Sequence, residues 1–394
     1  MRLFMYLGKG ALCLRLPLLR SRPSSIYSGE TEHLVKKIEH RFGRALVPNV
    51  RSALLQVPLH LFVESYYQQY GNHLRWDLIS FPSTDDVYQD EALVTKVDKG
   101  GHPICSSSQP SVMALQLEAL DLHPGLSVLE IGTGTGYNAA LMDVLVRPTG
   151  HVTSIDIDPE LVSTAIQHLA STGAESVLAT KGDGFEGYLS QAPYDRVLAT
   201  CAVRSLPRTW VAQLALGGLL VANLRLNLVS VFLLLKKIDT MTLRGCFLDI
   251  CASYMEMYNA GRQPPSPRID WKVYDAEPRH ELQLPANLSE LFAQPAYSLL
   301  LQCLLPHVIK KYRAFPDRDE IHLYLMDPSF PGEAILVEGN HVTLIGTQEH
   351  LEKRLLQSIE WYDRFHPTIE DYQVIFAETQ AQIHLGDMCF SLEI

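Results

Sequence analysis

The sequence lacks the cysteine patterns, long apolar runs and positive charge that mark several large classes of protein. Its seven cysteines are scattered, with no Cys-x-x-Cys pair and no metal-ligand spacing of cysteine and histidine, so neither a metal site nor a disulfide framework is predicted. No stretch reaches the roughly 18 apolar residues that a membrane-spanning helix needs. The net charge of −11 is opposite to the basic excess typical of proteins that bind nucleic acid. We therefore expect a globular protein with reduced thiols, as in the cytoplasm, that binds neither membrane nor nucleic acid.

The chain is long enough for more than one unit. Five basic residues precede the first acidic residue, Glu30, so residues 1–31 are interpreted as a basic tail: an organelle-targeting segment, a disordered tail or translated upstream sequence. A chain of 394 residues exceeds the usual size of a single core. We predict one domain over residues 32–226 and a C-terminal α+β extension over residues 227–394.

Strand and helix patterns alternate between residues 126 and 225, which predicts an α/β fold with a mostly parallel sheet and helices on both faces. Residues 65–100 carry turn formers and acids, so we expect irregular structure there. Beyond residue 226, the pattern predicts two strands at residues 229–237 and 242–250 that still belong to the first sheet or its edge. It then predicts a linker at 263–268, a mainly helical stretch at 289–311, a strand at 320–326, a hairpin at 333–347 and a long amphipathic helix at 348–363.

The most informative stretch is the loop after the first strand of this alternation, where Gly132, Gly134 and Gly136 occupy every second position. Glycine lets the backbone approach a ligand closely, and this edge of a doubly wound sheet is where nucleotide-like ligands bind. The spacing differs from the G-x-G-x-x-G of dinucleotide folds, and the carboxylate of Glu130 would repel phosphates. A cationic nucleoside without phosphate fits better, and S-adenosyl-L-methionine is the predicted cofactor.

Two more acidic residues follow the next two strands in register. Asp156 ends the second strand, where a carboxylate can accept hydrogen bonds from both ribose hydroxyls. Asp183 lies between two glycines after the third strand and can meet the exocyclic amine of adenine. Taken singly, Asp156 and Asp158 before Pro159 could cap a helix. Asp183 could belong to a plain turn, but the joint occurrence of the motifs favours a cofactor site. The predicted cofactor-binding residues are Glu130, Gly132, Thr133, Gly134, Gly136, Tyr137, Asp156, Ile157, Asp183 and Gly184.

Other segments carry a more specific pattern: Val-Pro-Leu-His-Leu-Phe-Val at 57–63, Ser-Gln-Pro at 108–110, and Ala-Pro-Tyr-Asp-Arg at 192–196. With the glycine loop, they resemble the protein-L-isoaspartate O-methyltransferase family over about residues 34–225. The resemblance implies a class I S-adenosylmethionine-dependent methyltransferase fold, a Rossmann-like doubly wound sheet. The chain departs from the family pattern at Leu59, where the family has Arg, and at Asp156, where it has Glu.

The resemblance also implies a reaction, which is methyl transfer from S-adenosylmethionine to a carboxylate of a peptide or protein. A carboxylate is already ionised at neutral pH, so the reaction needs no strong general base. Ser108 matches the signature serine of the family and is expected to hold the acceptor, although a helix cap or a turn is the structural alternative. Thr200 is the second candidate catalytic residue, and Cys201 is expected to be a buried small residue and not a nucleophile.

The segment Asp-Glu-Ala-Leu-Val-Thr-Lys at residues 90–96, the serine triplet at 106–108 and the long C-terminal part resemble a bacterial subgroup associated with lanthipeptides and other ribosomally made modified peptides. That resemblance implies methylation of an aspartate in such a peptide, leading through a succinimide to isoaspartate or aspartimide. Repair of isoaspartyl sites in damaged proteins is one alternative. A non-catalytic homologue that binds cofactor or peptide is another. The expected partner is a peptide or protein with an aspartyl or isoaspartyl carboxylate.

Overall fold

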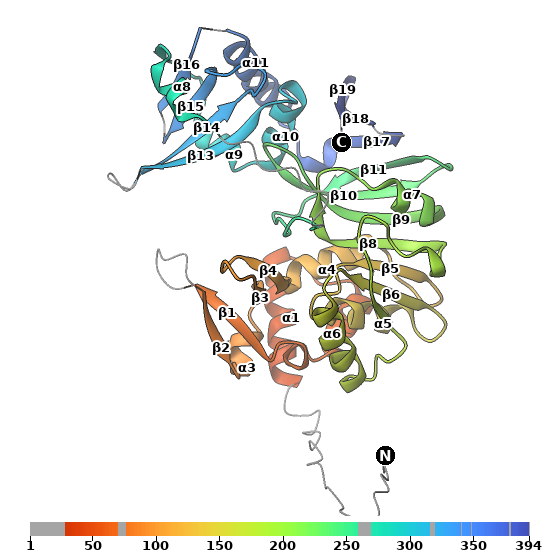
Figure 1. Ribbon diagram of the computed structural model, residues 1–394. Coiled ribbons are helices and arrows are strands. Elements are labelled where there is room, and N and C mark those ends of the chain that lie inside the picture. Colours follow the sequence, from red (N-terminus) through yellow and green to blue (C-terminus); the bar gives the residue numbers. More distant parts are fainter. Residues whose placement is uncertain are drawn as a thin grey trace, which may run out of the picture.

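The computed structural model describes residues 28–69, 76–258, 269–315, 320–339, 341–347, 349–377 and 380–393 (Figure 1). The predicted linker at 263–268 and most of the predicted basic tail lie outside these ranges. Among the described residues, no helix combines the length and the apolar character needed to cross a bilayer. The same residues contain no cluster of three side chains suited to hold a metal ion.

The N-terminal part combines helices with a small antiparallel sheet in the strand order β2-β1-β3-β4. Its elements are α1 (Ser28–Phe42), α2 (Pro48–Gln56), a 3-10 turn (Leu59–Leu61), β1 (Ser65–Gln69), β2 (Trp76–Ser80), α3 (Thr84–Val87), β3 (Leu93–Val97), β4 (Pro103–Ser107) and α4 (Pro110–Ala119). The prediction of irregular structure at residues 65–100 is therefore wrong. Strands β1 and β2 are mostly exposed or half-buried, so they lack the apolar alternation by which a strand is recognised.

The main sheet has ten strands in the order β19-β18-β17-β11-β10-β9-β8-β5-β6-β7. Its elements are β5 (Ser127–Ile131), α5 (Tyr137–Val146), β6 (His151–Asp156), α6 (Pro159–Ser171), β7 (Leu178–Lys181), a 3-10 turn (Leu189–Gln191), β8 (Tyr194–Val203), α7 (Arg208–Gln213), β9 (Leu214–Arg225), β10 (Ser230–Lys237), β11 (Thr242–Leu248), a 3-10 turn (Ile369–Asp371), β17 (Tyr372–Ala377), β18 (Gln380–Leu385) and β19 (Met388–Glu393). Strands β7, β6, β5, β8 and β9 are parallel. The rest pair antiparallel and lengthen the sheet beyond β9.

Both faces of the parallel half are covered, and this burial explains the apolar character of its strands. Along β5, Val128 packs into the core with α1, α2 and α5, whereas Leu129 and Ile131 pack into the core on the opposite face. Because side chains alternate along a strand, Glu130 points to the same face as Val128. Glu130 is fully buried there, which makes its partners important for the site.

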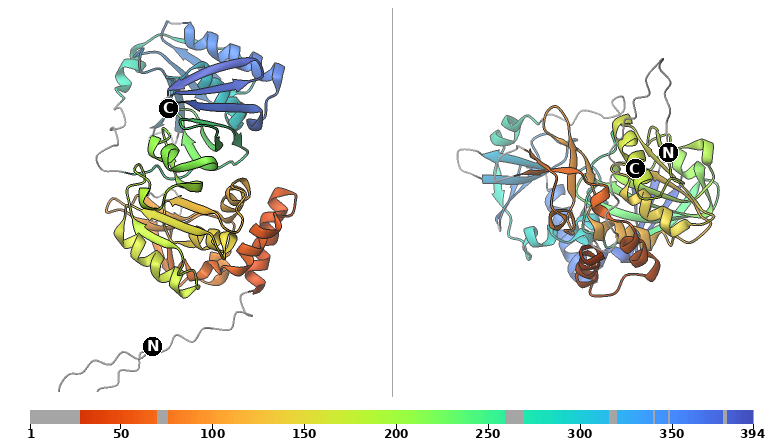
Figure 2. Two further views of the ribbon diagram at one scale, coloured as in Figure 1. Left: turned by 90° about the vertical axis from the view of Figure 1, so that its right-hand side faces the viewer. Right: turned by 90° about the horizontal axis from the view of Figure 1, so that it is seen from below.

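The remaining elements form a second lobe, seen in teal and blue above the parallel strands in Figure 2, left. They are α8 (Trp271–Ala276), β12 (Arg279–Glu281), α9 (Leu288–Phe292), α10 (Pro295–Leu304), β13 (Ile309–Phe315), β14 (Glu320–Met326), β15 (Ala334–Glu338), β16 (His341–Ile345) and α11 (His350–Phe365). The five strands form an antiparallel sheet in the order β12-β16-β15-β14-β13. The predicted strand, hairpin and long helix are confirmed. The helical prediction for residues 289–311 holds for α9 and α10 but fails after Leu304, where α10 ends, and from Ile309 the chain forms β13.

The predicted fold class, an α/β methyltransferase-type sheet with a C-terminal α+β extension, is confirmed. The predicted strands at 229–237 and 242–250 do extend the first sheet, as β10 and β11. The predicted domain boundary between residues 226 and 227 falls between β9 and β10, which are hydrogen-bonded neighbours in that sheet. The last strands, β17–β19, also return to it (Figure 1). The division into two domains at this point stays a prediction.

Candidate active site

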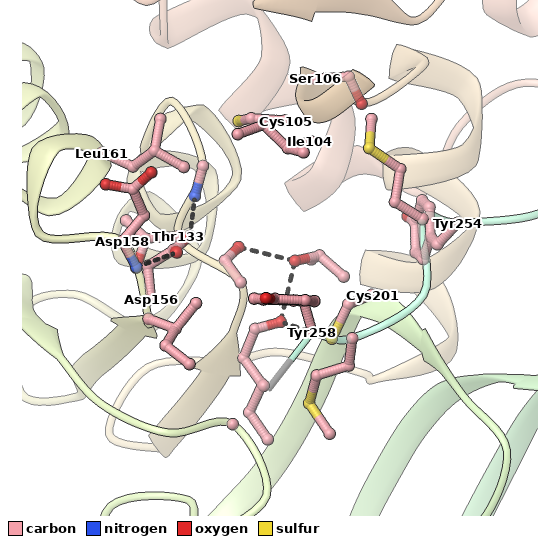
Figure 3. Close-up of a pocket in the computed structure, with 18 of the residues that line it drawn as sticks. Ile104, Cys105, Ser106, Thr133, Asp156, Asp158, Leu161, Cys201, Tyr254 and Tyr258 are labelled. Atoms are coloured by element: carbon pink, nitrogen blue, oxygen red, sulfur yellow. Dashed lines mark hydrogen bonds between the residues drawn. The ribbon is translucent and has the colours of Figure 1, made fainter. Parts of the chain in front are cut away.

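A cavity of about 760 Å³ lies at the carboxyl ends of β5, β6 and β8 (Figure 3). Its volume falls within the roughly 300–1,000 Å³ of small-molecule sites. Six parts of the chain supply most of its lining: the glycine loop after β5, the loop after β6, the turn after β7, the end of β8, the region around β4, and a segment that follows β11. The carboxyl edge of a doubly wound sheet is the expected place for such a site.

The glycine loop has a backbone shape that other residues would strain. Gly132, Gly134 and Gly136 have φ values of +102°, +51° and +87°, which L-residues with a side chain rarely adopt. A Cβ added at Gly132 would also lie 2.5 Å from Oγ1 of Thr200. The loop therefore needs glycine both for its turn and for its close packing on the end of β8.

Asp156 organises the loop from the neighbouring strand. Its Oδ2 accepts a hydrogen bond from the N–H of Gly134 at 3.0 Å, and its Oδ1 accepts one from the N–H of Asp158 at 3.0 Å. Burial raises the pKa of Asp156, and the backbone N–H donors oppose that shift. A backbone hydrogen bond from Ile157 also lowers the pKa of this carboxylate. Two carboxylate oxygens offer about four acceptor positions in all, so Asp156, which lines the cavity, can still accept a ligand hydroxyl. Asp158, by contrast, caps α6 by accepting from the N–H of Glu160, the helix-cap role considered for acids at this position.

Glu130 lies beneath the loop in a closed hydrogen-bond network. Its Oε1 accepts from Nδ2 of Asn138 at 2.8 Å, and its Oε2 accepts from Oγ of Ser154 at 2.6 Å. Oγ of Ser154 also hydrogen-bonds with Oγ1 of Thr133 at 2.7 Å. Burial raises the pKa of Glu130 to about 7, and these donors only partly offset the effect. The network connects β5, β6 and α5 directly behind the cavity wall.

The structure brings most of the predicted cofactor residues to the cavity. The lining includes Glu130, Gly132, Thr133, Gly134, Asp156, Ile157 and Gly184. Gly136, Tyr137 and Asp183 are not among the lining residues: Tyr137 is buried against Phe62, with ring centroids 5.4 Å apart, and Oδ1 of Asp183 accepts from the N–H of Phe185. Binding of cofactor by the predicted set stays a prediction.

Ser108 lines the cavity at the end of β4. It precedes Gln109, which is the N-cap residue of α4, so the helix-cap alternative for Ser108 does not describe this structure. The buried carboxylate of Asp90 holds the turn, since its Oδ1 accepts from the N–H of Ser111 at 2.8 Å. Its Oδ2 lies 3.0 Å from Nε of Arg41. An ion pair from α1 thus helps to fix the serine.

Thr200 also lines the cavity, but its hydroxyl faces the glycine loop. Oγ1 donates to the carbonyl oxygen of Gly132 at 2.7 Å and lies 3.0 Å from that of Ile131. The hydroxyl has a single proton, so these carbonyls share it. In this arrangement Thr200 braces the loop, and its predicted contact with the acceptor stays a prediction.

Sequence reasoning missed one wall of the cavity, the segment Tyr254–Tyr258 (Figure 3). This segment runs beside the end of β8: the N–H of Ala202 donates to the carbonyl of Met255 at 2.8 Å, and the N–H of Met257 donates to the carbonyl of Ala202 at 2.7 Å. The contact is an isolated bridge without the length or periodicity of a strand. The sequence signal that could have indicated this wall is the cluster of large side chains Tyr-Met-Glu-Met-Tyr at residues 254–258.

The charge of the lining is strongly one-sided. The carboxylates of Asp98, Glu130, Asp156, Asp158 and Glu256 line the cavity, and no lysine, arginine or histidine is among its lining residues in the described chain. Two of these acids have basic partners outside the lining: Asp158 lies 2.7 Å from Lys96, and Glu256 lies 2.7 Å from Arg204. The raised pKa of Glu130 also reduces its charge near neutral pH. The net charge of the lining is therefore smaller than that of five ionised carboxylates, but a lining that has acids and, among the described residues, no basic side chain still disfavours phosphate and favours a cationic ligand. It lacks the basic groups with which nucleotide-binding sites hold phosphates.

Two cysteines line the cavity but are not activated. Burial raises the pKa of Cys105 to about 11 and that of Cys201 to about 12. A thiol with such a pKa stays protonated near neutral pH, and the thiolate is the nucleophilic form. The expectation of a buried residue is wrong for Cys201, which is half-buried and lines the cavity, while its raised pKa agrees with the absence of a nucleophilic role.

An acidic, phosphate-excluding cavity at this edge of a doubly wound sheet is the arrangement of class I S-adenosylmethionine-dependent methyltransferases. A family model described as protein-L-isoaspartate(D-aspartate) O-methyltransferase matches residues 30–245, which is more than half of the 394 residues. The chain belongs to this family of S-adenosylmethionine-dependent carboxyl methyltransferases. The family resemblance of the sequence is thereby confirmed.

Curated relatives carry the same family name. The protein-L-isoaspartate O-methyltransferase of Thermotoga maritima is 40% identical over 155 residues, covering 39% of this chain and 48% of the relative. That of Ignicoccus hospitalis is 43% identical over 114 residues, covering 29% of this chain and 54% of the relative. Each match spans about half the length of the relative.

A solved structure of a protein named protein-L-isoaspartate O-methyltransferase has a similar fold. It aligns with a TM-score of 0.54 and 24% identity, over 90% of this chain and 99% of its own. At this identity the similarity concerns the fold alone. Because 90% of this chain is covered, the shared fold includes much of the C-terminal lobe.

Proposed function

We propose that this protein transfers a methyl group from S-adenosylmethionine to a carboxylate of an aspartyl or isoaspartyl residue in a peptide or protein. The observation that carries the proposal is the cavity at the carboxyl edge of the sheet, lined by five carboxylates and no cationic side chain among the described residues. Family membership supports the same reaction.

The residues present fit the cofactor. Asp156 can still accept a ribose hydroxyl, and the glycine loop offers backbone without side chains to the methionine part. Ile157, Gly184 and Met257 also line the cavity and offer apolar surface for the adenine, and a side chain at Gly184 would meet Met257. When bound, S-adenosylmethionine supplies an electrophilic methyl group on a positively charged sulfonium, which the acidic lining favours electrostatically.

The residues of this chain position the two reactants and exclude water from them; they are not needed to transfer a proton. The acceptor carboxylate is ionised at neutral pH, so its oxygen can bond to the methyl carbon while the sulfur keeps the electron pair of the broken bond. Ser108 is proposed to hold the acceptor by donating a hydrogen bond. Correct alignment of two bound reactants can lower a barrier by about 7–11 kcal/mol in good cases.

The finer proposal concerns the identity of the acceptor. In an aspartyl methyl ester, the next backbone nitrogen attacks the ester carbonyl and displaces methanol, which forms a succinimide. Addition of water opens the ring mostly to isoaspartate, so methylation of a normal aspartate can mature a peptide. The sequence resemblance supports an aspartate of a ribosomally made modified peptide, and selecting one site needs additional recognition surface, which the C-terminal lobe can offer. The second candidate is repair of isoaspartyl residues, and the names of the relatives support it.

Mass spectrometry of three substrates separates these acceptors. The full-length protein would be incubated with S-adenosylmethionine and an isoaspartyl peptide, the same peptide with normal aspartate, or a cyclised precursor peptide. Methyl ester on the precursor but little on the isoaspartyl peptide supports maturation, and efficient methylation of the generic isoaspartyl peptide alone supports repair. Methylation of none of them would contradict the proposed reaction.

A further inference from the structure

Tyr254 has a fixed position on the acceptor side of the cavity. Its backbone N–H donates to Oδ1 of Asn223 at 3.0 Å, and its ring packs edge to face on Phe232, with centroids 5.3 Å apart. Figure 3 shows Tyr254 across the cavity from Asp156, the proposed ribose partner. A ring held by backbone and by packing presents its hydroxyl in a defined place.

The hydroxyl of Tyr254 is connected to the proposed acceptor residue. It donates to Oε1 of Gln116, a residue of α4 that is 1% exposed, and it is hydrogen-bonded with Ser108. Burial raises the pKa of Tyr254 well above its ordinary range, and the hydrogen bonds to Ser108 and Gln116 only partly oppose the shift. The phenol therefore keeps its proton and remains a donor at neutral pH.

The acceptor side needs donors of this kind. A carboxylate that enters the cavity meets no lysine, arginine or histidine among the lining residues of the described chain. It also loses hydration there, so hydroxyl and N–H donors must replace the lost hydrogen bonds. Oγ of Ser107 is buried beside Ser108 and has no hydrogen-bond partner within the described residues. Ser107 also lines the cavity, so a bound ligand could supply the missing partner.

We propose that Tyr254 binds the acceptor carboxylate together with Ser108, each hydroxyl donating a hydrogen bond to it, so that the segment after β11 completes the acceptor site. The phenol has a single proton, so the Tyr254 hydroxyl exchanges its hydrogen bond to Gln116 for one to the carboxylate when the substrate binds. This inference rests on the proposed carboxyl methyl transfer. It assigns substrate contact to a residue outside the glycine loop and the Ser-Gln-Pro segment. Two donors also make the site selective for a carboxylate over a carboxamide. The side-chain amide of an asparagine has only one acceptor oxygen, so one of the hydroxyls of Tyr254 and Ser108 would face its N–H₂ group without a hydrogen bond.

The test compares Tyr254→Phe, Ser108→Ala and the double variant of the full chain. Tyr254→Phe keeps the ring that packs on Phe232 and removes only the hydroxyl. Loss of one hydrogen bond to a charged group lowers kcat/KM for the peptide by about 10- to 100-fold. Because both hydroxyls bind one carboxylate, the double variant should lose less than the product of the two single effects. The affinity for S-adenosylmethionine, measured by calorimetry, should match that of the wild type. The unfolding temperature of Tyr254→Phe should fall modestly, because the buried Oε1 of Gln116 loses its donor, and kinetics are therefore measured well below it.

Tyr312→Phe is the matched control, because Tyr312 lies on β13 of the C-terminal lobe and is 61% exposed. It should retain wild-type kcat/KM. An active wild type together with an unchanged Tyr254→Phe variant would overturn this inference alone. So would a loss of kcat/KM that is fully matched by a loss of cofactor affinity or of folding. A wild type that methylates no peptide carboxylate would overturn both this inference and the proposed function.

Discussion

Replacing Asp156 by Asn perturbs the proposed cofactor site with little change in shape. The substitution removes one negative charge and turns one acceptor oxygen into an N–H₂ donor. Both carboxylate oxygens already accept backbone N–H groups, from Gly134 and from Asp158. The new amide group must therefore face one of these donors without a hydrogen bond, or turn toward the ligand and lose an acceptor there.

The size of the effect follows from this geometry. The asparagine keeps one carbonyl oxygen, which cannot accept the N–H groups of Gly134 and Asp158 and a ribose hydroxyl as well. A hydrogen bond to a charged group contributes about 1.5–3 kcal/mol, which corresponds to about 10- to 150-fold in the dissociation constant. The loosened N–H of Gly134 would add to this loss because the loop carries part of the site.

Calorimetric titration with S-adenosylmethionine and with S-adenosylhomocysteine measures the change. The ribose is common to both ligands, so Asp156→Asn should weaken both. Asp363→Asn on the exposed face of α11 is the control and should bind as the wild type does. An Asp156→Asn protein that is folded and binds both ligands within about twofold of the wild type would refute the assigned role.

Three further predictions concern the loop, the buried acid and the acceptor turn. Gly132→Ala should abolish cofactor binding, because its Cβ would lie 2.5 Å from Oγ1 of Thr200. Gly173→Ala is the control, since Gly173 also has a positive φ, +75°, but open space around it. It should lose only about 1–2 kcal/mol of stability and retain cofactor binding. Glu130 has a pKa of about 7 in the folded protein against 4.5 ordinarily, so its titration lowers the free energy of unfolding as pH rises from 4.5 to 7. Urea unfolding at several pH values gives the free energy of unfolding of Glu130→Gln and of the wild type. The difference between them should shift in favour of the variant by about 3 kcal/mol as pH rises from 4.5 to 7. A difference that does not change with pH would contradict the raised pKa of Glu130. Asp90→Ala leaves the N–H of Ser111 without its acceptor and should cost about 1–3 kcal/mol of stability. Because Asp90 holds the turn that carries Ser108, the variant should lower kcat more than it lowers cofactor affinity. An unchanged kcat would contradict this role of Asp90.

The sequence predicted the parts of the fold whose signal is local. Alternating strands and helices indicated β5 to β9 with their helices, and the glycine pattern located the loop that lines the cavity. Both signals come from residues close together in the chain, where burial on both faces makes strands continuously apolar.

The missed features depend on contacts between distant segments. Strand β17 pairs with β11 and is followed in the sheet by β18 and β19, although more than 120 residues separate Leu248 from Tyr372. A local sequence pattern can indicate a strand, but it cannot indicate which distant strand pairs with it. Strands β1 and β2 are largely exposed and so show no alternation. Tyr254 enters the site through an isolated bridge, which only tertiary packing creates.

The central claim is that this protein methylates a peptide carboxylate, and one measurement tests it most directly. The wild type would be incubated with S-adenosylmethionine carrying an isotope-labelled methyl group and an aspartyl or isoaspartyl peptide, with the matching carboxamide peptide as control. The account predicts label in a base-labile methyl ester on the carboxylate peptide and none on the carboxamide. Label in a base-stable bond, equal label on both peptides, or no label with saturating cofactor on any carboxylate peptide would contradict it.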